Sequence, residues 1–251
     1  MFAEERHRII LEILKEQSRV SVLELTKILG ASEATVRRDL HLLENNGNLK
    51  RSHGGALLKS VSTYEPLFSE KTVLHKQEKE YIATLAARHI NDGDTIILDS
   101  GTTTLALALL LKQKQLQIIT TSIDIADILG ESHAIDVILT GGIIRQTTKA
   151  LVGDIAVKSL LQFHVHKAFL GINSIEENCG FTTPSIEEAT IKKTMIRQAS
   201  EIFFLADSSK FDTISFANVA SLKEGHVIVT DKKLKNSSKN RYEKCGVVII
   251  N

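Results

Sequence analysis

The sequence predicts an α/β protein of two domains, a small helical N-terminal domain and a larger C-terminal domain built on a mostly parallel β-sheet. Three observations support this. The chain has 251 residues, more than the roughly 100 to 200 typical of one domain. Its first sixty residues have the spacing of three helices and a glycine-bearing hairpin. From about Asp94 onward, short apolar runs alternate with amphipathic stretches, as strands and helices alternate around a parallel sheet.

The composition allows a packed core in both domains but identifies no partner. Hydrophobic residues make up 43% of the chain, and 31 Lys and Arg against 30 Asp and Glu leave a formal charge of +1. The acidic start of the chain does not fit a signal peptide, and no apolar run approaches the roughly 18 residues of a membrane span. We therefore expect a cytoplasmic protein. Cys179 and Cys245 lie far apart, which argues against a disulfide framework or a zinc site.

Three helices are expected in the N-terminal domain. The first buries one apolar face, formed by Ile9, Ile10, Ile13 and Leu14. The second begins at Ser21, because Ser21 and Glu24 have the spacing of a capping box, and it ends at Gly30. The third follows Ser32, and its buried face carries apolar residues at helical spacing, namely Val36, Leu40 and Leu43.

The opposite face of the third helix is polar and carries Glu33, Ala34, Arg37, Arg38 and His41. Arg37 and Arg38 lie near its start, where a guanidinium can pair with guanine in the major groove or bind a phosphate. Residues 49–56 predict a two-stranded wing with cations along the DNA backbone. The alternative is that the two arginines are only a solvated helix face. The expected DNA contacts are Ser32, Glu33, Thr35, Arg37, Arg38, His41, Lys50, Arg51 and His53.

Residues 3–57 closely resemble the winged helix-turn-helix head of the DeoR family of transcription regulators. The resemblance lies in the stretch from Ser32 to Leu40, in Leu43-Glu44 and Gly47, and in the ending from Arg51 to Ala56. It implies that double-stranded DNA is the partner of this domain. After it comes the polar, proline-containing segment 59–66. We therefore predict a DNA-binding domain at 1–58, a linker at 59–74, and a sensor and oligomerisation domain at 75–251.

Seven apolar runs predict buried strands of a sheet that is covered on both faces. They are Thr95 to Leu98, Gln117 to Thr120, Asp136 to Leu139, Ala168 to Ile172, Ile202 to Ala206, Val227 to Thr230 and Val247 to Ile250. Ligands of such folds bind beyond the carboxyl ends of the strands. We therefore expect a small-molecule site in the loops that follow these runs.

The loop from Asp99 to Thr104 carries the densest chemical signal. It lies between a strand and a helix and offers hydroxyls, backbone N–H groups and a helix N-terminus, all of which favour a phosphate. Lys210 adds a cation, and Asp207 can accept from sugar hydroxyls. The alternative is that these residues are helix caps and turn formers. The expected effector site comprises Asp99, Ser100, Gly101, Thr102, Thr103, Thr104, Thr121, Ser122, Gly141, Gly142, Arg145, Asp207 and Lys210.

Residues 75–232 are similar to the C-terminal sensor of the DeoR family. The shared features include Asp92-Gly93-Asp94, the stretch from Leu98 to Thr104, Gly141-Gly142, Lys192 and the stretch from Asp207 to Phe211. The resemblance implies a fold similar to ribose-5-phosphate isomerase and the glucosamine-phosphate deaminases, and a sugar-phosphate effector. One departure is Thr121, where the family often has Asn.

The most complete interpretation is a regulator, a repressor of a carbohydrate operon that leaves its DNA operator when a phosphorylated sugar binds. We expect a homodimer or homotetramer without a cofactor. The alternatives are a sugar-phosphate isomerase or deaminase, with Glu187 or Glu188 as its base, and a scaffold that only recruits partners. His164 and His166 can share one strand face, but no third metal ligand lies at a recognisable spacing. We therefore expect no metal site.

Overall fold

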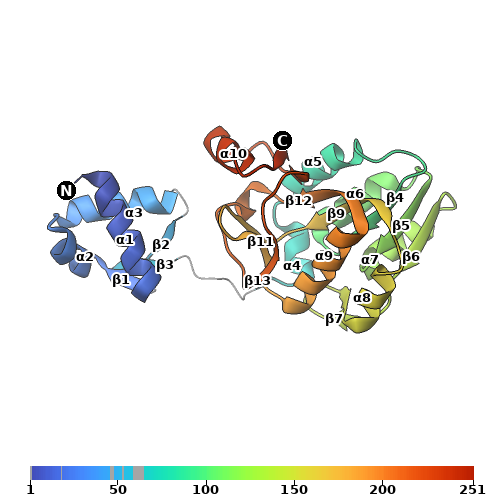
Figure 1. Cartoon of the computed structure of the whole chain (residues 1–251), viewed down its shortest axis with the longest axis horizontal. Coiled ribbons are helices and arrows are strands. Elements are labelled where there is room, and N and C mark those ends of the chain that lie inside the picture. The colour runs from blue at the N-terminus through green and yellow to red at the C-terminus, as the bar shows by residue number, and fades with distance from the viewer. Residues whose placement is uncertain (1, 18, 46–47, 53, 59–64) are drawn as a thin grey trace. The chain divides into compact units, whose positions relative to one another are not determined.

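The computed structural model describes residues 2–17, 19–45, 48–52, 54–58 and 65–251. The chain divides into two compact units, of which the first contains most of residues 1–61 and the second most of residues 62–251. Figure 1 follows the chain through both units. Of the predicted linker, residues 59–64 lie outside the described residues.

The N-terminal unit is a winged helix-turn-helix with three helices and a three-stranded antiparallel sheet in the order β1-β3-β2. Its elements are α1 (Ala3–Gln17), β1 (Arg19–Ser21), α2 (Val22–Leu29), α3 (Glu33–Asn45), β2 (Leu49–Ser52) and β3 (Gly55–Leu58). Apolar side chains from all three helices and from the sheet form one core. The strand β1 has only three residues and was not predicted.

Local sequence signals set the helix ends of this unit. The predicted capping box at α2 is present, with Ser21 Oγ accepting from the N–H of Glu24 at 3.1 Å and the Glu24 carboxylate accepting from the N–H of Ser21 at 2.8 Å. Gly30 ends α2 in the left-handed conformation at φ 59°. A Cβ on Gly55 would lie 2.1 Å from the carbonyl oxygen of Val20, so only glycine lets β1 approach β3 this closely.

The second unit is built on a seven-stranded, wholly parallel sheet in the order β15-β14-β12-β9-β4-β5-β6. All seven predicted strands belong to it, each within a few residues of its expected bounds. They are β4 (Thr95–Leu98), β5 (Leu116–Thr120), β6 (Ile135–Leu139), β9 (Val165–Gly171), β12 (Ala199–Leu205), β14 (His226–Val229) and β15 (Val248–Ile250).

Alternate residues of a strand point to opposite faces of the sheet. Both faces of this sheet are therefore apolar, and helices cover both of them. Ile96 and Leu98 of β4 belong to one apolar cluster, whereas Ile97 belongs to the other. The first cluster includes residues from α5 (Lys76–Ala87), α6 (Thr102–Leu111) and α7 (Ile123–Gly130). The second includes residues from α8 (Asp154–Leu160), α9 (Ile186–Gln198) and α10 (Asn236–Glu243).

Several short elements were not predicted. The hairpin of β7 (Ile143–Arg145) and β8 (Ala150–Val152) follows β6, and a small antiparallel sheet has the order β10-β11-β13. The latter strands are β10 (Ser174–Glu176), β11 (Gly180–Thr183) and β13 (Ala217–Ala220). A helix, α4 (Phe68–Val73), lies within the segment predicted as a linker. The 3₁₀ turn η1 (Ser208–Lys210) follows β12.

The strand order reverses between β4 and β9. From β4 the chain adds β5 and β6 on one side, and from β9 it adds β12, β14 and β15 on the other. Adjacent loops therefore diverge beyond the carboxyl ends of β4 and β9, which leaves room for a ligand. The sheet topology thus selects the loop after β4 as the centre of a candidate site.

Candidate functional sites

The exposed face of α3 presents the predicted DNA contacts. Arg37 and Arg38 are both exposed, and Arg37 is 3.4 Å from Glu33. Arg38 makes no ion pair with any residue that the structure describes. Ser32 precedes the helix, where its Oγ accepts from the N–H of Thr35 at 3.3 Å. The helix entrance is therefore ordered by its own cap, and its two guanidinium groups remain exposed to solvent.

The wing is joined to the same face. Arg51 of β2 approaches His41 of α3, with 3.2 Å between Nη1 and Nδ1. Its backbone N–H donates to the Glu44 carboxylate at 2.8 Å. Lys50 is exposed beside it, whereas the predicted contact His53 lies outside the described residues. The structure thus brings the predicted helix and wing residues together, apart from His53.

The residue that follows the two arginines points inward. The side chain of Asp39 is 3% exposed and pairs with Arg6 at 2.7 Å and with His7 at 3.1 Å, both on α1. Burial alone would raise the pKa of Asp39, but the hydrogen bonds from Arg6 and His7 outweigh it and lower the pKa. An ionised Asp39 therefore links α3 to α1.

In the second unit, the predicted loop lies at the reversal of strand order. Asp99 follows β4, and the first turn of α6 begins at Thr102. No side chain of the described residues caps that helix, so its first N–H groups are free to bind an anion. Thr104 is buried, and its hydroxyl donates to the carbonyl of Gly101 at 2.9 Å, so this hydroxyl is satisfied within the first turn and caps no N–H. Ser100 and Thr102 are half-buried, and Thr103 is buried.

Asp99 is wholly buried beside a lysine of α9. Its carboxylate pairs with the ammonium of Lys192 and accepts from the N–H of Gly171 at 3.0 Å. Burial alone would lower the pKa of Lys192, but the carboxylates of Asp99 and Glu188 raise it. The buried ammonium is therefore retained. Asp99 thus acts in this structure as the partner of a cation that the predicted site did not include.

The predicted residues after β5 and β6 have mixed roles. Ser122 caps α7, with its Oγ accepting from the N–H of Ile125 at 3.3 Å. Thr121 is fully buried, and its Oγ1 has no hydrogen-bond partner among the described residues. A Cβ on Gly142 would lie 2.7 Å from the carbonyl oxygen of Val152, so Gly142 permits close packing on β8. Gly141 is half-buried with φ 71°.

Arg145 binds carboxylates of the protein itself. Its guanidinium is 2.6 Å from Glu65 and 3.4 Å from Glu188. Glu188 also accepts from the hydroxyl of Thr148 at 2.5 Å. Ser185 and Glu188 have capping-box spacing, and Ser185 does cap α9. The inward contacts of Glu188 show that its carboxylate serves this network.

The third group of predicted residues follows β12. Asp207 is buried and accepts from the N–H of Ser209 at 3.0 Å, and Lys210 lies 3.9 Å from it. Lys79 of α5 is close enough to both for their charges to act on it. Burial lowers the pKa of Lys79 to about 8, and the charges of Lys210 and Lys71 contribute to the lowering. A second cation, Lys79, thus accompanies Lys210 and was not predicted.

The predicted effector site left out most of the charged residues around it, namely Glu65, Lys71, Lys79, Glu188 and Lys192. Lys79 and Lys192 belonged to the family resemblance, but no role was assigned to them. One signal was available for Glu188 and Lys192, because an i, i+4 spacing places both on one side of α9. No sequence pattern connects Glu65 with Arg145, since eighty positions separate them and the contact exists only in the folded chain.

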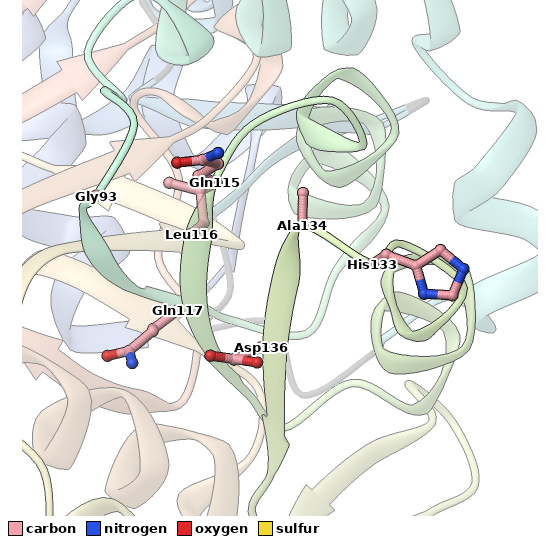
Figure 2. A pocket seen from close by; sticks show the side chains of 7 residues that line it. All are labelled: Gly93, Gln115, Leu116, Gln117, His133, Ala134 and Asp136. Atoms are coloured by element: carbon pink, nitrogen blue, oxygen red, sulfur yellow. The ribbon is translucent and has the colours of Figure 1, made fainter.

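A cavity of about 500 Å³ lies at the opposite ends of the strands (Figure 2). Gln117 and Asp136 face it from paired positions on β5 and β6. Its lining residues include no lysine or arginine, so it does not suit a phosphate. Among the described residues no three His, Cys, Asp or Glu side chains group as metal ligands, and His166 contacts the N–H of Thr95 at 3.1 Å. In the same part of the chain, every helix is too short or too polar to cross a bilayer.

The fold and the two sites define a DNA-binding regulator with a sensor domain. The chain belongs to the DeoR family: residues 6–61 match the model of the DeoR-like helix-turn-helix domain, and residues 74–232 match that of the DeoR C terminal sensor domain. The predicted membership is confirmed.

Named relatives agree with this class. The transcriptional regulator FruR of Bacillus subtilis is 37% identical over 100% of this chain and 99% of its own. The lactose phosphotransferase system repressor of Lactococcus lactis is 38% identical over 90% and 89%. Ribose 5-phosphate isomerase from Methanocaldococcus jannaschii aligns with a TM-score of 0.41 and 20% identity over 54% of each chain. Because the sequence relatives are regulators, the chain is a transcriptional regulator and not an isomerase or deaminase.

Proposed function

We propose that this regulator represses a carbohydrate operon and that a phosphorylated sugar releases it from its operator. The DNA is bound by the face of α3 and by the wing, and the sugar phosphate is bound at the carboxyl ends of the sheet strands. No cofactor takes part, and the protein acts in the cytoplasm. The repressor name of the Lactococcus relative supports the direction of control.

The observation that carries the effector proposal is the set of polar loops at the carboxyl ends of the strands, where the strand order reverses. The uncapped start of α6 suits the phosphate, because unpaired N–H groups and the helix dipole favour an anion. Lys210 adds a point charge. The buried Oγ1 of Thr121 has no described partner, and such a group is costly unless a ligand or water binds it. A sugar hydroxyl is a suitable partner.

The proposed DNA contacts are divided by their role. Arg37 and Arg38 are placed for base edges or phosphates, and Lys50, Arg51 and His53 for phosphates beside the helix. Ser32 and Thr35 offer hydroxyls at the entrance, and Glu33 and His41 complete the exposed face. One head covers only a small interface, so two heads in an oligomer provide the affinity of the whole repressor.

The assembly, a homodimer or homotetramer, is proposed to use the β6 edge patch, which we define as Ile138, Leu139, Ile143, Ile144 and Ile155. These side chains are 37 to 69% exposed. The strand β6 is a sheet edge without proline or lysine, and such edges pair readily. Exposed apolar side chains gathered beside a sheet edge are typical of protein–protein interaction sites.

Calorimetry with sugars and their phosphates tests the effector site. We expect a phosphorylated sugar to bind and its neutral parent to bind at least about tenfold more weakly, because only the phosphate can use α6 and Lys210. Lys210→Ala and Thr102→Glu should each abolish the preference. Lys193→Ala, at an exposed position on α9, is the matched control. Equal binding of sugar and phosphate, or unchanged affinity in both site variants, would falsify the site.

A further inference from the structure

Glu65 is a buried carboxylate on an irregular segment. Its side chain is 3% exposed, and it accepts from Lys71 at 2.5 Å, Arg145 at 2.6 Å and Asn173 at 3.2 Å. Burial alone would raise the pKa of Glu65, but the charges of Lys71 and Arg145 outweigh this and lower it. Residues 65–67 belong to no helix or strand. Glu65 is thus an ionised group bound into the sensor unit mainly by its side chain.

The charges around Glu65 are balanced. Three carboxylates, those of Asp99, Glu188 and Glu65, alternate with three cations, and the pairs are Asp99 with Lys192, Glu188 with Arg145, and Glu65 with both Arg145 and Lys71. Each additional unpaired charge in such a buried place is costly. An anionic ligand that reaches Arg145 therefore competes with one of the carboxylates already bound there.

The three carboxylates differ in how firmly they are placed. Asp99 directly follows β4 and also binds the N–H of Gly171. Glu188 lies in the first turn of α9 and binds Thr148. Glu65 has no such support from a strand or helix, although the neighbouring Phe68 donates its N–H to the carbonyl of Thr147 at 2.9 Å. Glu65 can therefore leave Arg145 without displacing a strand or a longer helix, although it must also give up its contacts with Lys71 and Asn173.

We propose that Glu65 is an exchangeable internal anion of the effector site, which occupies Arg145 until an anionic ligand replaces it. Glu65 comes directly after residues 59–64, which connect the two units in sequence. Its release loosens the attachment of residues 65–74 to the rest of the sensor unit, and so couples the occupancy of Arg145 to the part of this unit that comes first after the DNA-binding unit in sequence. The inference rests on the proposed effector site and adds the residue that transmits its occupancy.

Amide hydrogen exchange of the full-length protein tests whether an anion replaces Glu65. Inorganic phosphate is the probe, and sodium chloride at equal ionic strength is its control. We expect phosphate, but not chloride, to speed the exchange of backbone amides in residues 65–74. In Glu65→Gln the same amides should exchange rapidly without phosphate, and phosphate should bind roughly five- to tenfold more tightly because its competitor has lost its charge. Glu80→Gln, an exposed carboxylate on α5, should behave as the parent does.

A second variant tests the same proposal without changing Glu65. Arg145→Gln removes the shared cation, so residues 65–74 should exchange rapidly and phosphate should cause no further change. If phosphate binds the parent and residues 65–74 stay equally protected, the proposal that a ligand replaces Glu65 is wrong, whereas the proposed effector site is retained. If phosphate and the sugar phosphates all fail to bind the parent, both proposals are overturned.

Discussion

Neighbouring residues in α3 have opposite tasks. Arg37 and Arg38 are exposed on the proposed DNA face, whereas Asp39 is buried and binds two residues of α1. The helical period explains this, because a step of one residue turns about 100° around the axis. A single short stretch thus supplies both the proposed DNA contacts and the buried contact that holds them in position.

Replacing Arg37 or Arg38 with Ala should weaken operator binding. We expect a loss of about 1 to 3 kcal/mol that depends on the base sequence if the side chain reads a base, and a similar loss on all sequences if it binds a phosphate. Fluorescence anisotropy with operator and scrambled DNA at two salt concentrations separates the two. Arg8→Ala, an exposed arginine of α1, is the control. Parental affinity in both α3 variants contradicts the proposed surface.

The effector residues show how far residue types alone can predict a site. The hydroxyl-rich loop from Ser100 to Thr104 was predicted from its own composition, and it does lie where the strand order reverses. Lys192 was seen only as part of a family resemblance, because an isolated lysine in a helix resembles a surface residue. The predicted role of Arg145 was also incomplete, because its partner Glu65 is distant in sequence.

At the scale of elements, long apolar runs were predictable and short strands were not. The seven core strands all contain apolar runs, and in the inner strands β4, β9 and β12 these runs are buried on both faces. By contrast β1, β7, β8 and β10 have three residues each and lie outside the alternation of apolar runs and helical stretches that predicted the core strands. The equally short β15 was predicted because it lies in the run from Val247 to Ile250. The helix α4 was taken for linker because it buries none of its residues, and so has no apolar face for the sequence to reveal.

The contact between α1 and α3 should depend on the charge of Asp39. Asp39→Asn should destabilise the head by about 1 to 3 kcal/mol at pH 7, because Arg6 and His7 lose a charged acceptor. Since the folded-state pKa of Asp39 is lowered, its contribution is present above the unfolded pKa and is lost as the pH falls through the folded value.

Hydrogen exchange of α1 and α3 in the full-length protein measures this free energy. The difference between parent and variant should shrink as the pH is lowered towards 3. Asp154→Asn removes a carboxylate that is 89% exposed and should change nothing. A difference that stays constant across this pH range rules out the ionised contact.

At the scale of the whole molecule, the proposed function requires the two units to influence each other and two heads to act together. The fold of each unit was predictable from its own sequence, because both depend on local periodicity and on apolar residues that pack within the same unit. Assembly was expected only from the area that one head can bury on DNA. The β6 edge patch became visible only in the structure, which identifies the sheet edge and the apolar side chains exposed beside it.

The assembly can be tested by placing a charge in the β6 edge patch. Ile143→Glu should dissociate the oligomer, because an unpaired carboxylate in an apolar interface is costly, and should weaken binding to the full operator through the loss of the second head. Ile186→Glu, an equally exposed isoleucine on α9, should leave the oligomer intact. Sedimentation velocity reports the mass. A parent that sediments as a monomer and still binds its operator fully is incompatible with this proposal.

The central claim is that operator and sugar phosphate each weaken the binding of the other. The most direct test measures the effect of each ligand on the dissociation constant of the other. The dissociation constant of the operator is measured with and without a panel of sugar phosphates, and that of each sugar phosphate with and without operator. Thermodynamic reciprocity requires one factor in both directions. The account predicts that at least one sugar phosphate weakens operator binding about tenfold or more, that operator weakens its binding equally, and that its neutral parent has no effect. Operator affinity that no sugar phosphate in the panel lowers would contradict it.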